Sequence, residues 1–182
     1  MLYQIVSFLL DVVAGLLSGA CLLRLYMQWQ RVPFGNPVGQ VVFALSDWLI
    51  LPLRKVIPPL GRIDTASLLA AALVQLLQYL VLWLLLGAGS GLLWLPWLAL
   101  CGLARVALTG MTGIILVYTV LSWVQTRSAL SEVLQRLSEP LLRPLRRVIP
   151  LVGGVDFAPL VLLVLLQVAV MVLGYVQASV LR

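Results

Sequence analysis

The sequence contains no histidine and very little charge. Of its 182 residues, 10% are charged and 63% are hydrophobic, and the mean hydropathy is +1.12. The lack of His excludes His-ligated metals, His-ligated haem and His general-base catalysis from this chain. Its two cysteines, Cys21 and Cys101, stand alone in apolar surroundings and form no metal-binding spacing. No catalytic triad, acidic metal cluster or phosphate loop occurs, so we expect no enzyme, no metal and no cofactor.

The apolar composition predicts an integral membrane protein. Soluble domains are about 45–50% apolar and about 25% charged, and so short a chain cannot bury this much apolar surface in an aqueous core. Because hydrocarbon offers the backbone no hydrogen-bond partners, the spans must be helices. Four stretches reach the roughly 20 residues that cross a bilayer: Leu2–Tyr26, Thr65–Leu86, Arg105–Val124 and Phe157–Val180. We therefore predict an all-α membrane protein with four transmembrane helices.

A fifth apolar stretch, Leu92–Leu103, is too short to span a bilayer. It contains Trp94, Pro96 and Trp97, and aromatic residues favour the membrane interface. We interpret it as a helix that lies on the membrane surface.

The basic residues fall in two clusters, which predicts the topology. The loop after the first span carries Arg24, Arg31, Arg54, Lys55 and Arg62, and the loop after the third carries Arg127, Arg136, Arg143, Arg146 and Arg147. Basic loops stay on the cytoplasmic side, so both termini should lie outside. The net charge of +6 then reflects topology and anionic lipid, and no nucleic acid partner is expected.

A motif recurs 92 residues later in the chain. Pro52-Leu53-Arg54-Lys55-Val56-Ile57-Pro58, followed by Gly61 and Asp64, matches Pro144-Leu145-Arg146-Arg147-Val148-Ile149-Pro150, followed by Gly153 and Asp156. Each copy has two spans, so the copies keep the same orientation and form a parallel repeat. We predict a first repeat over 1–90, an interfacial connection over 91–104 and a second repeat over 105–182.

Each cytoplasmic segment should contain a helix before the motif. Asn36 and Pro37 supply an N-cap and a first helical residue. In the second copy, apolar residues from Leu130 to Leu141 share one helical face, with Glu132 and Arg136 mostly opposite. Such a helix lies at the interface or dips in as a re-entrant helix, and the sequence leaves both open.

The motif itself has a structural and a functional interpretation. Paired prolines stop a helix from continuing, the glycines allow a turn, and the aspartates sit where an N-cap of the next span is needed. The motif would then be an anchor and a helix start. Alternatively, it makes a two-copy charged site for an ion, a lipid or a partner, formed by Arg54, Lys55, Asp64, Arg146, Arg147 and Asp156.

Polar residues within the spans are the remaining candidates. Gly15 and Gly19 form a GxxxG pattern that permits close helix packing. Gln75 and Gln167 occupy equivalent places in the two repeats. Asp11 is either an intramembrane carboxylate, which costs about 2.5–3.5 kcal/mol near the bilayer centre, or an N-cap at the outer interface.

The motif resembles the YggT family of bacterial and plastid membrane proteins. The resemblance covers Arg24–Trp29, Pro52–Asp64, Trp123 and Pro140–Pro159. The first copy has Trp48 where Pro140 stands in the second, and Tyr118 falls near the place of Arg24. The resemblance implies a non-enzymatic protein of the bacterial inner membrane, where the topology predicted from the basic loops makes both termini periplasmic. It also implies a link to osmotic stress and ion homeostasis.

Two functions remain open at this point. The first is a scaffold or assembly factor whose basic motifs engage anionic lipid and a partner membrane protein or a second copy of the chain. The second is an oligomeric ion channel or transporter that uses Asp11, Gln75 and Gln167.

Overall fold

The computed structural model describes residues 1–56, 64–85, 92–124, 128–149 and 156–180 of the chain. These residues form six α-helices and one short 3-10 helix, with no strand among them. Four helices are long and apolar enough to cross a membrane: α1 (Leu2–Trp29), α3 (Thr65–Leu85), α4 (Leu95–Val124) and α6 (Ala158–Val180). The predicted all-α fold with four membrane-crossing helices is confirmed.

The start of α4 corrects one prediction. Residues 95–103, expected to form a separate surface helix, are the first turns of a continuous 30-residue helix that follows the 3-10 turn Leu92–Trp94. Pro96 does not break this helix, because in the first turn its missing N–H has no intrahelical partner to lose. At about 1.5 Å per residue α4 is about 45 Å long, which exceeds the roughly 30 Å hydrocarbon core.

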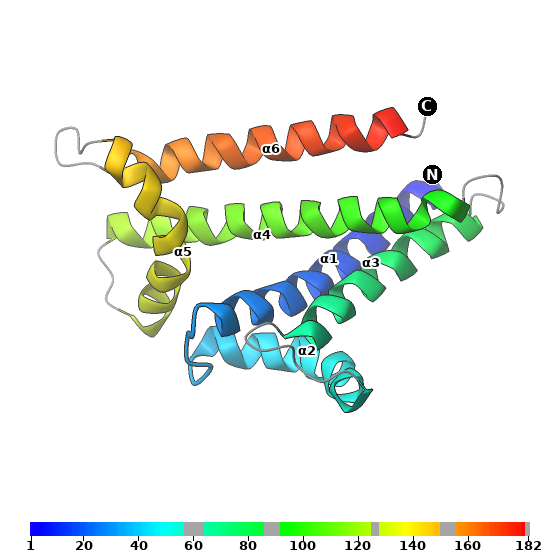
Figure 1. Ribbon diagram of the computed structural model, residues 1–182, viewed down its shortest axis with the longest axis horizontal. Coiled ribbons are helices and arrows are strands. Elements are labelled where there is room, and N and C mark those ends of the chain that lie inside the picture. Colours follow the sequence, from blue (N-terminus) through cyan, green and yellow to red (C-terminus); the bar gives the residue numbers. More distant parts are fainter. Residues whose placement is uncertain (57–63, 86–91, 125–127, 150–155, 181–182) are drawn as a thin grey trace.

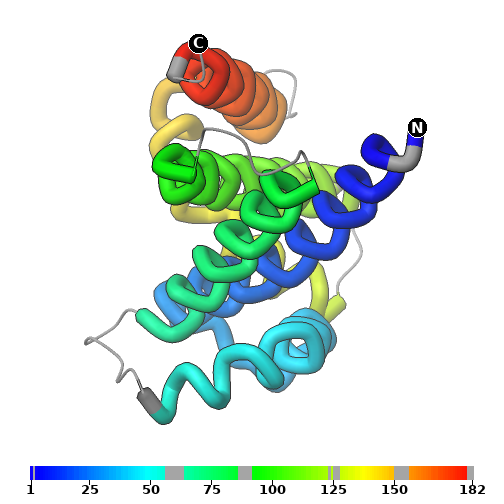
Figure 2. The backbone as a smooth tube through the Cα atoms, turned by 90° about the vertical axis from the view of Figure 1, so that its right-hand side faces the viewer, coloured from blue at the N-terminus to red at the C-terminus, as the bar shows by residue number. Residues whose placement is uncertain are grey.

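The remaining helices, α2 (Pro37–Val56) and α5 (Ala129–Val148), gather at one end of the molecule. In Figure 1, α5 crosses the ends of α4 and α6, and α2 lies below the ends of α1 and α3. Both chain termini lie at the opposite end. Figure 2 shows α4 between α6 and the α1–α3 pair. This arrangement matches a parallel repeat in which each copy is a span, a crossing helix and a second span.

The two crossing helices begin with equivalent caps. The Asn36 side-chain oxygen accepts a hydrogen bond from the backbone N–H of Gly39 at 2.9 Å, as the sequence predicted. In the second copy, 92 residues later, Ser128 and Ser131 form a reciprocal capping box. Each cap satisfies N–H groups that the first turn of a helix leaves free.

The first proline of each motif copy, Pro52 or Pro144, does not end its helix as predicted. Pro52 lies inside α2, and Pro140 and Pro144 lie inside α5, which continue to Val56 and Val148. A proline removes one intrahelical donor and bends a helix without ending it when flanking residues hold the helix in place. The second prolines of the motif, Pro58 and Pro150, and the turn glycines, Gly61 and Gly153, lie outside the described residues.

Helix α5 joins the two repeats. Val133 and Leu137 on its inner face pack against Met27 and Val32, at the end of α1. The Tyr26 hydroxyl donates to the Leu137 carbonyl at 2.8 Å. The apolar face of α5 therefore rests on the protein, and all of its charged residues except Arg146 are exposed.

Candidate functional site

In the first repeat, the motif arginine joins the end of α2 to the start of α3. Arg54 forms an ion pair with Asp64, and Asp64 is 1% exposed. The same carboxylate accepts from the Ser67 hydroxyl at 2.7 Å and from the Ser67 N–H at 3.4 Å. Asp64 is thus the N-cap of α3, and Arg54 supplies its counter-charge.

In the second repeat, the equivalent arginine has more partners. Arg146 donates from Nε to Asp156 at 2.8 Å, from Nη1 to Glu139 at 2.9 Å, and from Nη2 to the Tyr118 hydroxyl at 3.0 Å. Asp156 also accepts from the N–H of Ala158, at the start of α6. Arg146 therefore connects α4, α5 and the start of α6. We call these two pairs, Arg54–Asp64 and Arg146–Asp156, the clasps.

The pKa values of the clasp residues follow from these contacts. Burial alone would raise the pKa of Asp64, but hydrogen bonds from Arg54 and Ser67 outweigh it and lower the pKa below its ordinary value of 3.8. Burial alone would lower the pKa of Arg146, but its bonds to Tyr118 and Asp156 raise it. Asp64 and Arg146 therefore remain charged at neutral pH.

A third arginine, which the sequence did not single out as a site residue, is buried in the first repeat. Arg24, on α1, pairs with Asp47 and donates to the Ser46 hydroxyl at 3.0 Å. Its guanidinium lies 4.6 Å from the centre of the Phe43 ring, in cation–π geometry. A buried guanidinium of this kind must be paired, and α2 supplies the pairing. The signal in the sequence was the charge of Arg24 within an apolar span.

In the second repeat, the hydroxyl equivalent to that of Ser46 has no hydrogen-bond partner among the described residues. Ser138 is equivalent to Ser46, is 0% exposed and makes no hydrogen bond within the described part of the chain. Tyr118 stands where the first repeat has Arg24, so the donor that reaches Ser46 has no counterpart.

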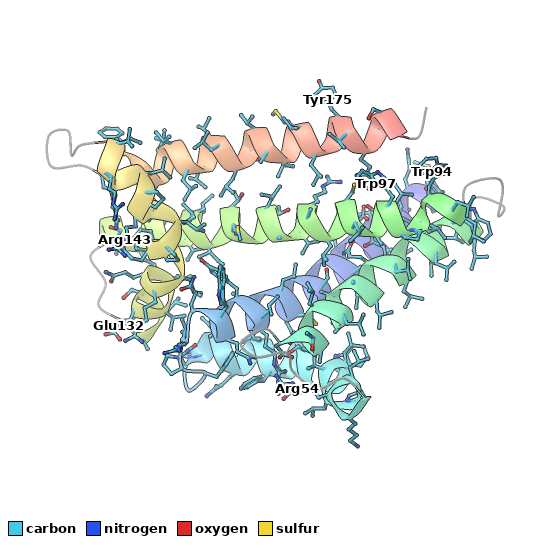
Figure 3. All side chains as sticks on the ribbon, viewed as in Figure 1. Arg54, Trp94, Trp97, Glu132, Arg143 and Tyr175 are labelled. Carbon is cyan, nitrogen blue, oxygen red and sulfur yellow. The ribbon has the colours of Figure 1, made fainter. Side chains whose placement is uncertain are left out.

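The other basic residues of the crossing helices remain exposed. Lys55, Arg143 and Arg147 form no ion pair or hydrogen bond with any described residue. Figure 3 shows Arg54 and Arg143 toward the α2 and α5 end, whereas Trp94, Trp97 and Tyr175 lie toward the other end. Trp29 and Trp48, near the basic end, are also exposed, so aromatic residues occur at both ends, as is typical of membrane proteins, whereas these unpaired basic residues lie at one.

The polar residues of the first two spans bond to each other. Asp11 lies inside α1, which begins at Leu2, so the N-cap interpretation is wrong. Its carboxylate accepts from the Gln78 side chain. Gln75 is buried and donates to the Ser18 hydroxyl at 3.0 Å. Gln78, which no pattern in the sequence had singled out, is therefore the partner of Asp11.

The remaining candidates are Gln167 on α6 and the two glycines of the GxxxG pattern on α1. Gln167 is exposed on α6 and makes no hydrogen bond with a described residue, in contrast to Gln75. Gly19 faces Val106 of α4, since an added Cβ would lie 3.7 Å from it, whereas the same atom on Gly15 would meet open space. No group of three metal-binding side chains occurs in the part of the chain that the structure covers.

Comparisons with known proteins agree with the two-repeat architecture. The CCB3/YggT family model matches twice, over residues 3–85 and 97–177. "Uncharacterized protein YggT" of Escherichia coli is 40% identical over 166 residues, which cover 89% of this chain and 85% of that protein. "Uncharacterized protein in proC 3'region" of Vibrio alginolyticus is 36% identical over 92% of both chains. No solved structure matches. The chain belongs to the CCB3/YggT family.

Proposed function

We propose that this protein is a non-enzymatic scaffold or assembly factor of the bacterial inner membrane, linked to osmotic or envelope stress. Its termini face the periplasm. The basic ends of α2 and α5 hold anionic lipid at the cytoplasmic surface, while the lipid-exposed side of α6 binds a partner membrane protein or a second copy.

The observation that carries the proposal is the division of the basic residues into two sets. Arg24, Arg54 and Arg146 are bound to carboxylates of the same chain, so they hold the fold together. Lys55 and Arg147, their neighbours in the motif, are exposed and unpaired within the described residues. Each basic residue near an anionic membrane surface contributes about 1 kcal/mol of attraction.

The exposed glutamine of α6 supports a protein partner. Gln167 lies near the middle of the membrane-crossing stretch Ala158–Ser179. An amide in hydrocarbon lacks partners, and glutamines on transmembrane helices commonly bond across a helix–helix contact. By contrast, Asp11 and Gln75 bond to neighbouring side chains, which supports a packing role for them over ion conduction.

Lipid selectivity tests the proposal. The protein is placed in nanodiscs, and the association of spin-labelled phosphatidylglycerol is compared with that of spin-labelled phosphatidylcholine. We expect wild-type protein to favour phosphatidylglycerol, and the triple variant Lys55→Gln, Arg143→Gln, Arg147→Gln to lose most of that preference. Arg105→Gln, at an exposed site nearer the other end of α4, is the control. Equal selectivity in wild type and triple variant would refute the proposal.

The partner surface has a separate test. Gln167→Leu should remove a cross-linked dimer or heteromer from native membranes, because leucine cannot replace the amide hydrogen bond. Val168→Leu, at the neighbouring exposed position on α6, should leave the cross-linked species unchanged. A cross-linking pattern identical in both variants would count against α6 as the contact.

A further inference from the structure

A groove of about 740 Å³ lies between α1 and α2 of the first repeat and α4 of the second. These three helices, with Leu68 of α3, form its walls, and nearly all of the lining is apolar. Representative lining residues are Leu16, Gly19, Trp29, Val41, Leu45 and Gly110. The groove ends at the last turn of α1, beside Tyr26 and Trp29. It therefore begins within the bilayer and reaches the interface.

The groove lies where the two repeats differ in how much of the crossing helix is covered by protein. Val133 and Leu137 of α5 are 6% and 0% exposed, because they pack on the end of α1. Their equivalents on α2, Val41 and Leu45, are 59% and 37% exposed and line the groove. The first repeat thus presents an apolar surface that its counterpart covers with protein.

The size and chemistry of the groove select its occupant. Its apolar walls offer water almost no hydrogen-bond partners. Small-molecule sites hold about 300–1,000 Å³, a range that suits a hydrocarbon chain. An acyl chain of a membrane lipid is therefore the occupant that fits.

Just after the groove-lining part of α1, one arginine has a strained backbone conformation. Arg31 lies two residues beyond Trp29, and its φ of 54° is in the left-handed region. Its N–H bonds to the Gln28 carbonyl, and the next N–H, of Val32, bonds to the Met27 carbonyl. This is a Schellman motif, whose left-handed position usually holds glycine; a non-glycine residue there costs about 1 kcal/mol or more.

The Arg31 side chain is available to a ligand. It is exposed and makes no ion pair or hydrogen bond with any residue the structure describes. Backbone geometry favours glycine here, so the arginine is unexplained by the fold of the loop. A guanidinium is well suited to hold a phosphate by paired hydrogen bonds.

We propose that the groove holds an acyl chain of one glycerophospholipid, whose phosphate binds Arg31. This inference rests on the proposed function for its lipid setting and deepens it, because it assigns one specific lipid site between the repeats. The bound lipid covers Val41 and Leu45 of α2, as the end of α1 covers Val133 and Leu137 of α5.

Retention of lipid by purified protein tests the site. Protein in mild detergent is incubated with palmitoyl-oleoyl phosphatidylglycerol or with a diacylglycerol of the same chains, and bound lipid is counted by native mass spectrometry. Gly110→Phe places a ring in the groove, and the first atom of the new side chain, its Cβ, meets nothing within 4 Å. Gly113→Phe is the matched control, since it also meets open space but does not line the groove.

We expect wild type and Gly113→Phe to retain one phosphatidylglycerol per chain, and Gly110→Phe to retain at least five-fold less. Arg31→Gly should bind both lipids equally, whereas wild type prefers the phospholipid. Arg31→Gly should also melt at a higher temperature without lipid, because it relieves the left-handed strain. A solely structural role for Arg31 predicts no change in lipid preference.

Full lipid retention by Gly110→Phe, or an equal loss in both phenylalanine variants, would overturn the groove site. Dissociation of a dimer by Gly110→Phe with unchanged lipid would do the same, because it identifies a second copy as the occupant. These failures leave the proposed function testable on its own, since the selectivity from Lys55, Arg143 and Arg147 does not depend on the groove.

Discussion

Helices α2 and α5 occupy equivalent places in the two repeats, yet their outer faces carry different chemistry. The exposed face of the middle of α2 is apolar and includes Val41, Leu45, Trp48 and Leu51. That of α5 is polar and consists of Glu132, Gln135, Arg136, Glu139, Arg143 and Arg147. The shared N-caps and clasps therefore specify the path of the chain, while the outer residues suit one helix to hydrocarbon and the other to headgroups or water.

The repeats also balance their charges differently. The first uses two arginines for two acids, because Arg24 pairs with Asp47 and Arg54 with Asp64. The second uses one, since Arg146 pairs with both Glu139 and Asp156. The second repeat has no arginine at the place of Arg24, and the buried Ser138 hydroxyl finds no partner among the described residues. Equivalent positions thus differ in how completely their polar groups are paired, so the same substitution should have different effects in the two repeats.

The largest difference is expected between the two clasp aspartates. Asp64→Asn removes the charge that pairs with Arg54 and weakens the cap of α3, at a buried site. We expect a loss of about 3 kcal/mol. Asp156→Asn affects a half-exposed carboxylate and should cost about 1 kcal/mol. Unfolding in mixed micelles, followed by circular dichroism, measures both. Equal losses of unfolding free energy would show that burial of the aspartate does not determine how strongly a clasp stabilises the fold.

The same aspartate predicts a pH dependence. Because folding lowers the pKa of Asp64, its contribution to stability is fully present above the ordinary value of 3.8. It is lost as the pH falls through the lower folded value. The free-energy difference between wild type and Asp64→Asn should therefore shrink as the pH is lowered from 5 towards 2. A difference that stays constant over this range would contradict the ion pair.

Replacing the buried arginine should have an intermediate effect. Arg24→Gln loses the bond to Asp47 and the contact with the Phe43 ring, at about 2 kcal/mol. Its counterpart, Tyr118→Phe, removes only a hydroxyl that accepts from Arg146 and should cost about 1 kcal/mol. The same unfolding assay compares them. A larger loss in Tyr118→Phe would mean that the second repeat depends more on this position.

The smallest effect on stability is expected at the two buried serines, and its sign should differ between the repeats. Ser46→Ala removes an acceptor for Arg24 and a donor to the Val42 carbonyl, and should cost about 1 kcal/mol. Ser138→Ala removes a buried hydroxyl that has no partner in the described residues, and should be neutral or stabilising. Destabilisation by Ser138→Ala similar to that of Ser46→Ala would reveal a partner for Ser138.

The spans and caps could be predicted because they depend on local sequence. Apolar length locates α1, α3 and α6 to within three residues, and Asn36 is recognisable as a cap from its type and the following proline. Leu92–Leu103 was misassigned because length alone does not show whether a short apolar stretch continues into the next helix. The helix-internal positions of Pro52 and Pro144 likewise depend on flanking contacts that local propensity does not include.

The site could be predicted only in part, because its contacts join distant segments. The spacing of the motif predicted that Asp64 would cap α3, and the cap is present. Nothing in the sequence joined Arg24 to Asp47, or Asp11 to Gln78, since these pairs depend on how α1 packs against α2 and α3. The left-handed conformation of Arg31 was equally hidden, because an arginine gives no signal for it.

One matched pair tests most directly whether the free basic residues hold anionic lipid. Lys55 and Arg147 are equivalent positions of the motif, and both are exposed. The measurement is the preference for spin-labelled phosphatidylglycerol in nanodiscs, for Lys55→Gln and Arg147→Gln at low and high salt. The account predicts that both variants lose preference at low salt. The loss should be greater for Arg147→Gln, on the polar face of α5, and high salt should abolish the differences. An unchanged preference in both variants would contradict it.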